Sequence, residues 1–143
     1  MAALARFLAL RRSERRRTVE AAFWLLLVRL AFGILPFRRA LGLFRITLCE
    51  AAAGRIDAND AGEIGRAVER AARHVPFRAV CLQQAFAALM MMRRRGLAGT
   101  ARFGLARDQH GGLAAHAWTH CGELPVTGVA AARGYVAVAA FAA

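Results

Sequence analysis

The feature that most constrains the fold is a change in hydrophobic period at Gly96. Before this residue, apolar side chains recur at the three- and four-residue spacing of helices, whereas Ala101, Phe103 and Leu105 after it alternate as in a strand. Helices followed by short alternating segments predict an α+β domain, in which N-terminal helices precede a small antiparallel sheet. At 143 residues the chain is long enough for one domain with its own core.

Start and stop residues divide the chain into elements. The expected helices cover residues 13–35, 37–44, 60–74 and 81–95. Ser13 is expected to cap the first, Asn59 or Asp60 the third, and Gly96 to end the fourth. The expected strands cover residues 101–105, 113–120, 124–127 and 135–141, with polar turns between the first three.

Charge predicts an acidic partner. The net charge is +12, and all 21 basic residues are arginine, which binds carboxylates through paired hydrogen bonds. The arginines are spread along the chain and no nucleic-acid-binding motif accompanies them, so we expect no nucleic acid partner.

The cysteines and the longest apolar segment indicate in which compartment the protein works and whether it crosses a membrane. The three cysteines, Cys49, Cys81 and Cys121, form no C-x-x-C pair, which disfavours a thiolate zinc site. Their odd number disfavours a secreted disulfide framework and favours the cytoplasm. Residues 21–37 are apolar but short for a membrane span, and Arg29 interrupts them. We expect a buried or partner-facing helix rather than a transmembrane one, with peripheral membrane contact as an alternative.

Two residues carry candidate chemistry. Cys81 stands at the predicted start of a helix, where unpaired amides and the helix dipole favour a nucleophilic thiolate. His116 lies within a predicted strand among alanines, and strand alternation puts Ala114, His116, Trp118 and His120 on one face. A buried structural cysteine and a core histidine are the plain alternatives. A helix-start cysteine followed by a strand histidine is also the arrangement of papain-like and transglutaminase-like enzymes.

Several ordered motifs extend this interpretation. They are Cys81-Leu82-Gln83-Gln84-Ala85, Arg93-Arg94-Arg95-Gly96, Ala115-His116-Ala117-Trp118 and Pro125-Val126. Together they resemble the lasso-peptide leader peptidases, which are transglutaminase-like cysteine proteases and are often the second half of a split protein. The resemblance is strongest over residues 66–127. It implies a transglutaminase/papain-like core over residues 51–143, preceded by a helical region over residues 1–50 used for packing or partner docking.

The resemblance also implies a reaction and its partners. Cys81 would be the nucleophile and His116 the general base in removal of a leader peptide from a ribosomally made lasso-peptide precursor. A separate leader-recognition protein would present the precursor, and a macrolactam cyclase would receive the cleaved core. We expect no cofactor and no metal, since no cysteine or carboxylate spacing reinforces the histidines as ligands.

The sequence does not identify the group that orients His116. Family members commonly place an aspartate about twelve residues after the histidine, where this chain has Gly128. Asp108 and Glu123 are the nearest acids but fit turns better, and a backbone carbonyl or amide is a further alternative. Trp118 and His120 are expected to line the site. The missing aspartate also motivates a second hypothesis, a catalytically weak transglutaminase-like scaffold or adaptor that binds a peptide or protein.

Overall fold

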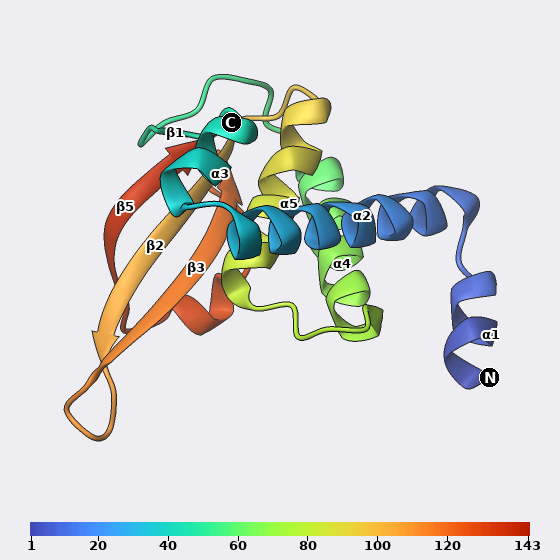
Figure 1. The fold of residues 1–143 in the computed structure, drawn as a ribbon. Coiled ribbons are helices and arrows are strands. Elements are labelled where there is room, and N and C mark those ends of the chain that lie inside the picture. Colours follow the sequence, from blue (N-terminus) through green and yellow to red (C-terminus); the bar gives the residue numbers. More distant parts are fainter.

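The computed structural model describes residues 1–143 as helices packed on one five-stranded antiparallel sheet (Figure 1). The helices are α1 (Ala2–Leu8), α2 (Arg12–Ile34), α3 (Phe37–Leu43), α4 (Ala58–His74) and α5 (Cys81–Arg94), with the 3-10 turn η1 (Ala130–Ala132). The strands are β1 (Thr47–Leu48), β2 (Gly99–Arg107), β3 (Leu113–Cys121), β4 (Leu124–Thr127) and β5 (Val136–Ala142), in the spatial order β1-β5-β2-β3-β4. This arrangement confirms the predicted α+β class.

Most predicted element bounds agree with the structure, but two predicted helix caps are wrong. Ser13 lies inside α2, whose N-cap is Arg11, and the backbone N–H of Arg11 donates to the Glu14 carboxylate. Asp57, rather than Asn59 or Asp60, caps α4 by accepting the backbone N–H of Asp60. Asp57, Asn59 and Asp60 are all good cap residues, so composition alone does not select one of them, and the arginine that caps α2 is not a residue type that composition would suggest. α1 and β1 were not predicted.

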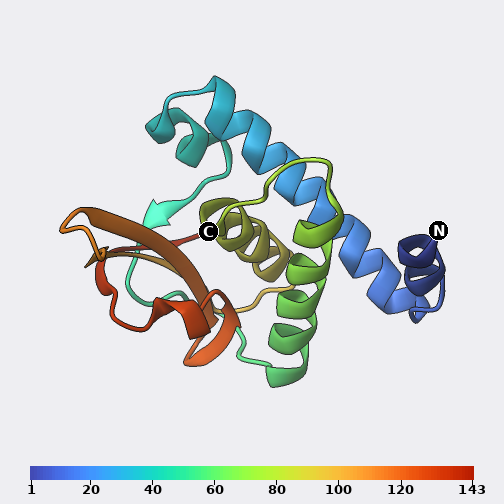
Figure 2. The ribbon, with the colours of Figure 1, turned by 90° about the horizontal axis from the view of Figure 1, so that it is seen from below.

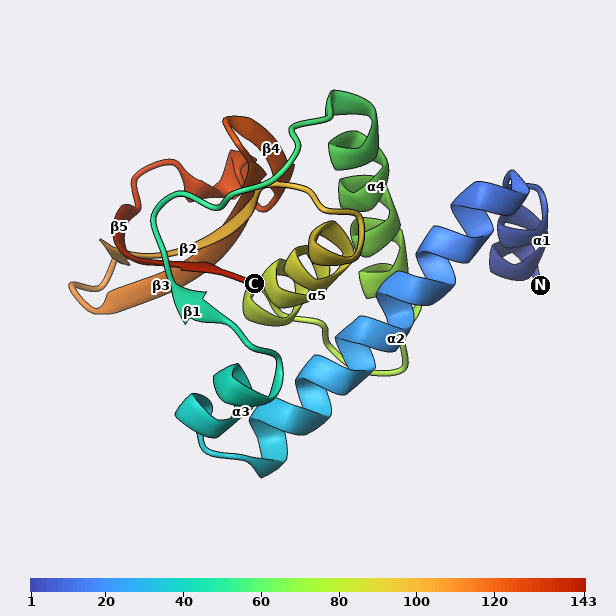
Figure 3. The same cartoon turned by 90° about the horizontal axis from the view of Figure 1, so that it is seen from above.

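α5 is the central helix of the molecule. Its eight residues from Ala85 to Met92 are all buried, and they span more than two turns, so every side of the helix is covered. α2, α4 and the sheet supply that cover (Figure 3). The Met90–Met92 run fills the core, with each residue fully buried.

An aromatic cluster joins α5 to α2 and to the sheet. The ring of Phe86 on α5 stacks on Phe32 of α2 at a centroid distance of 5.0 Å. Phe86 also meets Phe103 of β2 at 5.6 Å and Phe141 of β5 at 6.4 Å, both edge to face. These contacts show that the face of the sheet carrying Phe103 and Phe141 is the one that packs on α5.

α2 is the longest helix and lies across α4 and α5. Its buried residues, which face inward, are Thr18, Ala21, Leu25, Val28 and Ala31. They belong, apart from Thr18, to the same core cluster as residues of α4, α5 and the sheet. No helix of the structure combines the length and the hydropathy required to cross a bilayer. The apolar segment 21–37 therefore serves the core in part, as predicted.

An ion pair fixes α2 to the end of α5. The Glu20 carboxylate accepts hydrogen bonds from Arg95 at 2.7 Å and Arg94 at 2.8 Å. Burial by itself raises the pKa of Glu20, but the hydrogen bonds and charges of Arg95 and Arg94 outweigh it and hold this pKa below its ordinary value. The pair therefore favours the folded state once Glu20 is ionised.

Replacing Glu20 tests this link. Glu20→Gln should lower the free energy of unfolding at pH 7 by about 1–2 kcal/mol, a value discounted because Arg94 is well exposed. Because the folded pKa is depressed, the stabilisation is complete above the ordinary value of 4.5 and is lost as the pH falls below it. Urea unfolding of both proteins between pH 7 and pH 3 should show the difference shrinking. A constant difference would contradict the assignment.

Candidate functional site

Cys81 is the first residue of α5, as predicted. Its side chain is half-buried and packs against the edge of the core. The turn before it is held by two glutamines: Gln83 accepts the N–H of Val80 at 3.3 Å, and Gln84 donates to the Ala79 carbonyl at 2.9 Å. The first amides of a helix lack carbonyl partners within it, so the thiol stands where an anion is favoured. Such a position suits a nucleophile.

His116 lies in the middle of β3 and has a defined partner. Its Nε2 is 2.7 Å from the carbonyl oxygen of Gly128. Its ring stacks against Trp118, at a centroid distance of 5.9 Å, and meets Tyr135 at 5.4 Å. Gly128 takes a positive φ of 68°, and a Cβ there would lie 2.8 Å from the Ala117 carbonyl and 3.1 Å from His116 Nε2. A glycine is therefore needed for this close approach.

The hydrogen bond to Gly128 selects one form of the neutral imidazole. A carbonyl oxygen only accepts hydrogen bonds, so Nε2 of His116 must carry the proton and donate it. The other nitrogen, Nδ1, is then unprotonated and free to accept a proton. This is the tautomer that a general base requires, and the carbonyl holds the ring as a carboxylate or amide does in cysteine and serine proteases.

Strand alternation separates this histidine from the thiol. Phe103, which contacts Phe86 of α5, pairs with Ala117, whereas His116 pairs with Gly104, the next residue on β2. Adjacent residues of a strand face opposite sides of the sheet, so His116 lies on the side away from α5. The same side carries Trp118, whose ring lies over Gly104. Figure 2 shows η1 on this side of the sheet, opposite α5.

The structure therefore brings only some of the predicted site residues together. His116, Trp118 and the Gly128 carbonyl form one group, and Tyr135 joins it. Cys81 begins α5, which packs on the opposite face of the sheet, and no hydrogen bond joins its thiol to His116. The shared face predicted for His116 and Trp118 is correct, but that face is not the one that α5 covers.

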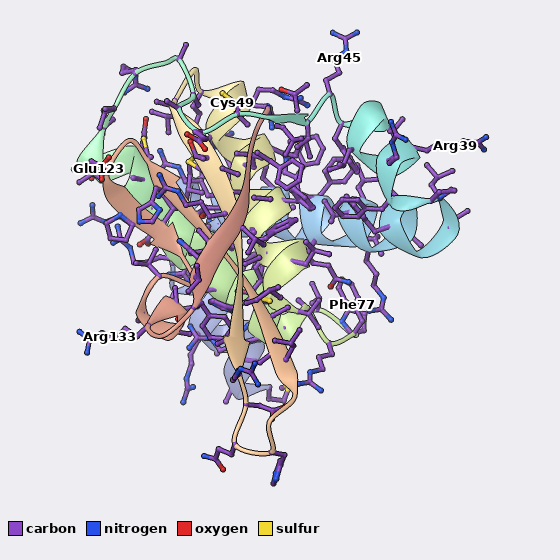
Figure 4. The ribbon with its side chains drawn as sticks, turned by 90° about the vertical axis from the view of Figure 1, so that its left-hand side faces the viewer. Arg39, Arg45, Cys49, Phe77, Glu123 and Arg133 are labelled. Carbon is purple, nitrogen blue, oxygen red and sulfur yellow. The ribbon has the colours of Figure 1, made fainter.

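The two acids considered as orienting groups lie in turns. Asp108 accepts the backbone N–H groups of His110 and Gly112 at 2.8 and 2.9 Å and so closes the β2–β3 turn. Glu123 lies in the β3–β4 turn at the periphery (Figure 4). Neither hydrogen-bonds to His116.

His120 belongs to a different contact. Its Nδ1 lies 3.2 Å from a guanidinium nitrogen of Arg102. Burial lowers the pKa of His120, the Arg102 charge lowers it further, and Glu123 opposes the shift. The imidazole of His120 is therefore neutral at pH 7 and accepts the Arg102 hydrogen bond. No three histidine, cysteine, aspartate or glutamate side chains lie together in an arrangement that would hold a metal ion.

Comparison with known sequences decides the family. Residues 24–140 match the transglutaminase-like superfamily. The chain belongs to this superfamily. No curated protein and no solved structure matched it. The match includes Cys81, His116 and Gly128, so the candidate nucleophile, base and orienting carbonyl all lie within the transglutaminase-like domain. This superfamily includes cysteine peptidases.

Of the two contacts of His116 beyond Trp118, the sequence left one open and did not indicate the other. The group that hydrogen-bonds the ring is a main-chain carbonyl, one of the alternatives left open, and it belongs to Gly128. Tyr135, the single tyrosine of the transglutaminase-like chain, reaches His116 from the start of β5, and neither its spacing nor its neighbours indicate this contact.

A matched pair of glycine variants tests the Gly128 contact. Gly128 and Gly134 both have positive φ, 68° and 84°, but a Cβ at Gly134 would meet nothing within 4 Å. Each alanine variant should lose about 1–2 kcal/mol from its backbone conformation. Gly128→Ala alone should lose more and should shift the ring ¹⁵N signals of His116. Equal destabilisation with unchanged His116 signals would contradict the contact.

Proposed function

We propose that this transglutaminase-like chain is a cysteine peptidase that removes the leader peptide from a ribosomally made lasso-peptide precursor. Cys81 is the nucleophile and His116 the general base. The observation that carries the proposal is the hydrogen bond from His116 Nε2 to the Gly128 carbonyl, because it leaves Nδ1 as a ready proton acceptor. The helix-start position of Cys81 and the ordered motifs around both residues support the same assignment.

The proposed reaction has two steps. His116 Nδ1 takes the thiol proton, and the Cys81 sulfur attacks the carbonyl carbon at the leader–core junction. The C–N bond breaks, the imidazolium gives its proton to the departing amine, and a thioester with the leader remains. Water, deprotonated by the same nitrogen, then releases the leader as a carboxylic acid and restores the thiol. First-turn amides of α5 would stabilise the oxyanion in both steps.

This chemistry requires His116 and Cys81 to meet, so the proposal includes a rearrangement. β4 pairs only with Thr119–Cys121 of β3, which leaves the part of β3 around His116 as an unpaired outer edge. We propose that a separate leader-recognition protein presents the precursor. In doing so it moves this edge of β3 and the β4–β5 connection so that His116 meets Cys81. The chain alone would then cleave slowly. A macrolactam cyclase would take the released core.

The separation of the two residues favours one alternative. If His116 stays on the side of the sheet away from α5, the chain is a transglutaminase-like scaffold or adaptor that binds a peptide or partner protein without cutting it. The thiol would then have no base. The two functions differ in the reactivity of Cys81 and in its requirement for cleavage.

Cleavage of the precursor peptide encoded with this chain is the direct test. With the recognition protein present, the wild-type chain should cut at one junction, and Cys81→Ala and His116→Ala should each reduce the rate at least about a thousandfold, as measured by mass spectrometry. Cys49→Ala and His110→Ala are matched controls and should cut normally. Cleavage by Cys81→Ala, or none by the wild type, would favour the scaffold function.

Thiol alkylation tests the nucleophile without a substrate. Cys49 and Cys81 are both half-buried, but only Cys81 begins a helix. At neutral pH and low iodoacetamide, Cys81 should be modified several times faster than Cys49, because the helix start favours the thiolate. Peptide mapping of the time course gives both rates in one sample. Equal rates would count against a nucleophilic role.

A further inference from the structure

The outer side of α2 carries an exposed apolar seam. Its members recur at steps of four, three and four residues, and each is about half exposed: Val19 at 58%, Phe23 at 53%, Leu26 at 46% and Leu30 at 47%. Ile34, which is 77% exposed, extends the seam to the end of the helix. Alternating steps of three and four are the spacing of the a and d positions of a coiled coil. The seam runs about 22 Å along the helix.

The charges around the seam all have one sign. Arg12 and Arg16 continue its spacing toward the start of α2, and Arg29 flanks its far end, each well exposed. The only acids of α2 are already engaged, Glu14 with the backbone of Arg11 and Glu20 with Arg94 and Arg95. Beyond the seam, Arg39 and Arg45 project into solvent around α3 (Figure 4). The seam is therefore apolar, with positive charge at both ends and no acid to balance it.

The spacing and charge of the seam decide which kind of partner it can bind. A second copy of the chain would bring the same arginines together, so self-association on this face is disfavoured. A helix that lies in a membrane surface is apolar on one side and polar on the other. α2 instead buries its opposite side in the core and presents a narrow seam. An amphipathic helix with leucine-type residues at its own a and d positions and acids beside them fits both the spacing and the charge.

The seam ends next to the candidate nucleophile. A shallow groove of about 540 Å³ lies between α2 and the start of α5, lined among others by Leu30 and Ile34 of the seam and by Leu82 and Gln83. Leu82 and Gln83 directly follow Cys81. The groove therefore connects the C-terminal end of the seam with the first turn of α5.

We propose that the α2 seam binds an acidic amphipathic helix belonging to the peptide substrate itself, and that the groove leads the following residues to Cys81. The part that concerns cleavage rests on the proposed peptidase function, whereas the docking does not. The recognition protein and the seam would then hold different parts of one peptide. Direct affinity between this chain and an acidic helix is expected without any other protein.

Binding is tested with a fluorescein-labelled synthetic peptide that carries leucine at a and d positions and glutamate beside them. Fluorescence anisotropy compares the wild type with Phe23→Asp and Leu26→Asp, and with Leu113→Asp as a matched control. Leu113 is an apolar residue that is even more exposed, at 72%, but it lies at the start of β3. Each seam variant should weaken binding at least about tenfold, and the control should bind as the wild type does. All three residues are exposed, so circular dichroism should be unchanged.

Two comparison probes complete the binding test. A peptide with lysine in place of glutamate should not bind, and vesicles of phosphatidylcholine and phosphatidylglycerol should not compete. Equal binding of acidic and basic peptides, or wild-type affinity in both seam variants, would overturn the proposal. Seam-dependent binding to the vesicles in place of the peptide would also overturn it and make the surface a membrane contact.

A reactive peptide tests the path to Cys81. The same acidic peptide, extended past its helix by a flexible segment ending in a chloroacetamide, should form a thioether with Cys81 as chloride leaves. Cys49 should remain unmodified, and Phe23→Asp should abolish the selectivity. Labelling of Cys49 instead would overturn the path. This readout needs no catalysis, so intact binding and labelling without precursor cleavage would refute the peptidase function and leave the docking proposal standing.

Discussion

The packing of Phe86 is the contact on which the arrangement of the layers depends. This fully buried ring touches Phe32 of α2 on one side and Phe103 and Phe141 of the sheet on the other. α2, α5 and the sheet thus meet at one side chain. Because aromatic rings bury a large area and pack in preferred geometries, this contact helps to set the distance between the layers and the side of the sheet that is turned toward the helices. It decides which side of β2 and β3 faces α5, and therefore where every candidate site residue points.

The order of elements could be predicted from the sequence because local signals determine it. The period change at Gly96 separated helices from strands, and prolines and glycines ended the elements close to their observed bounds. The short β1 escaped because two residues give no alternation. α1 escaped because alanine and leucine alone, without a cap, signal no start. The two wrong caps show the same limit, since a cap depends on the backbone angle at one residue.

The candidate site was predicted less completely, for a different reason. Alternation correctly grouped His116 with Trp118, but it does not say which side of a sheet a helix will cover. That depends on contacts between distant segments, such as Phe103 with Phe86, which no local pattern encodes. A backbone carbonyl was one of the alternatives for the partner of His116, but the sequence could not single out Gly128, because every residue has a carbonyl. The sequence therefore predicted which residues have suitable chemistry, but not how distant segments place these residues relative to one another.

The burial of α5 on every side has a consequence for how the molecule can move. A helix whose eight central residues are all enclosed cannot turn or slide without opening the core, so the start of α5, with Cys81, keeps its position while the core stays closed. The edge of β3 and the connection through η1 lie outside that core. Motion that changes the surroundings of the thiol must then occur in the sheet edge, and the thiol serves as a stationary reference point.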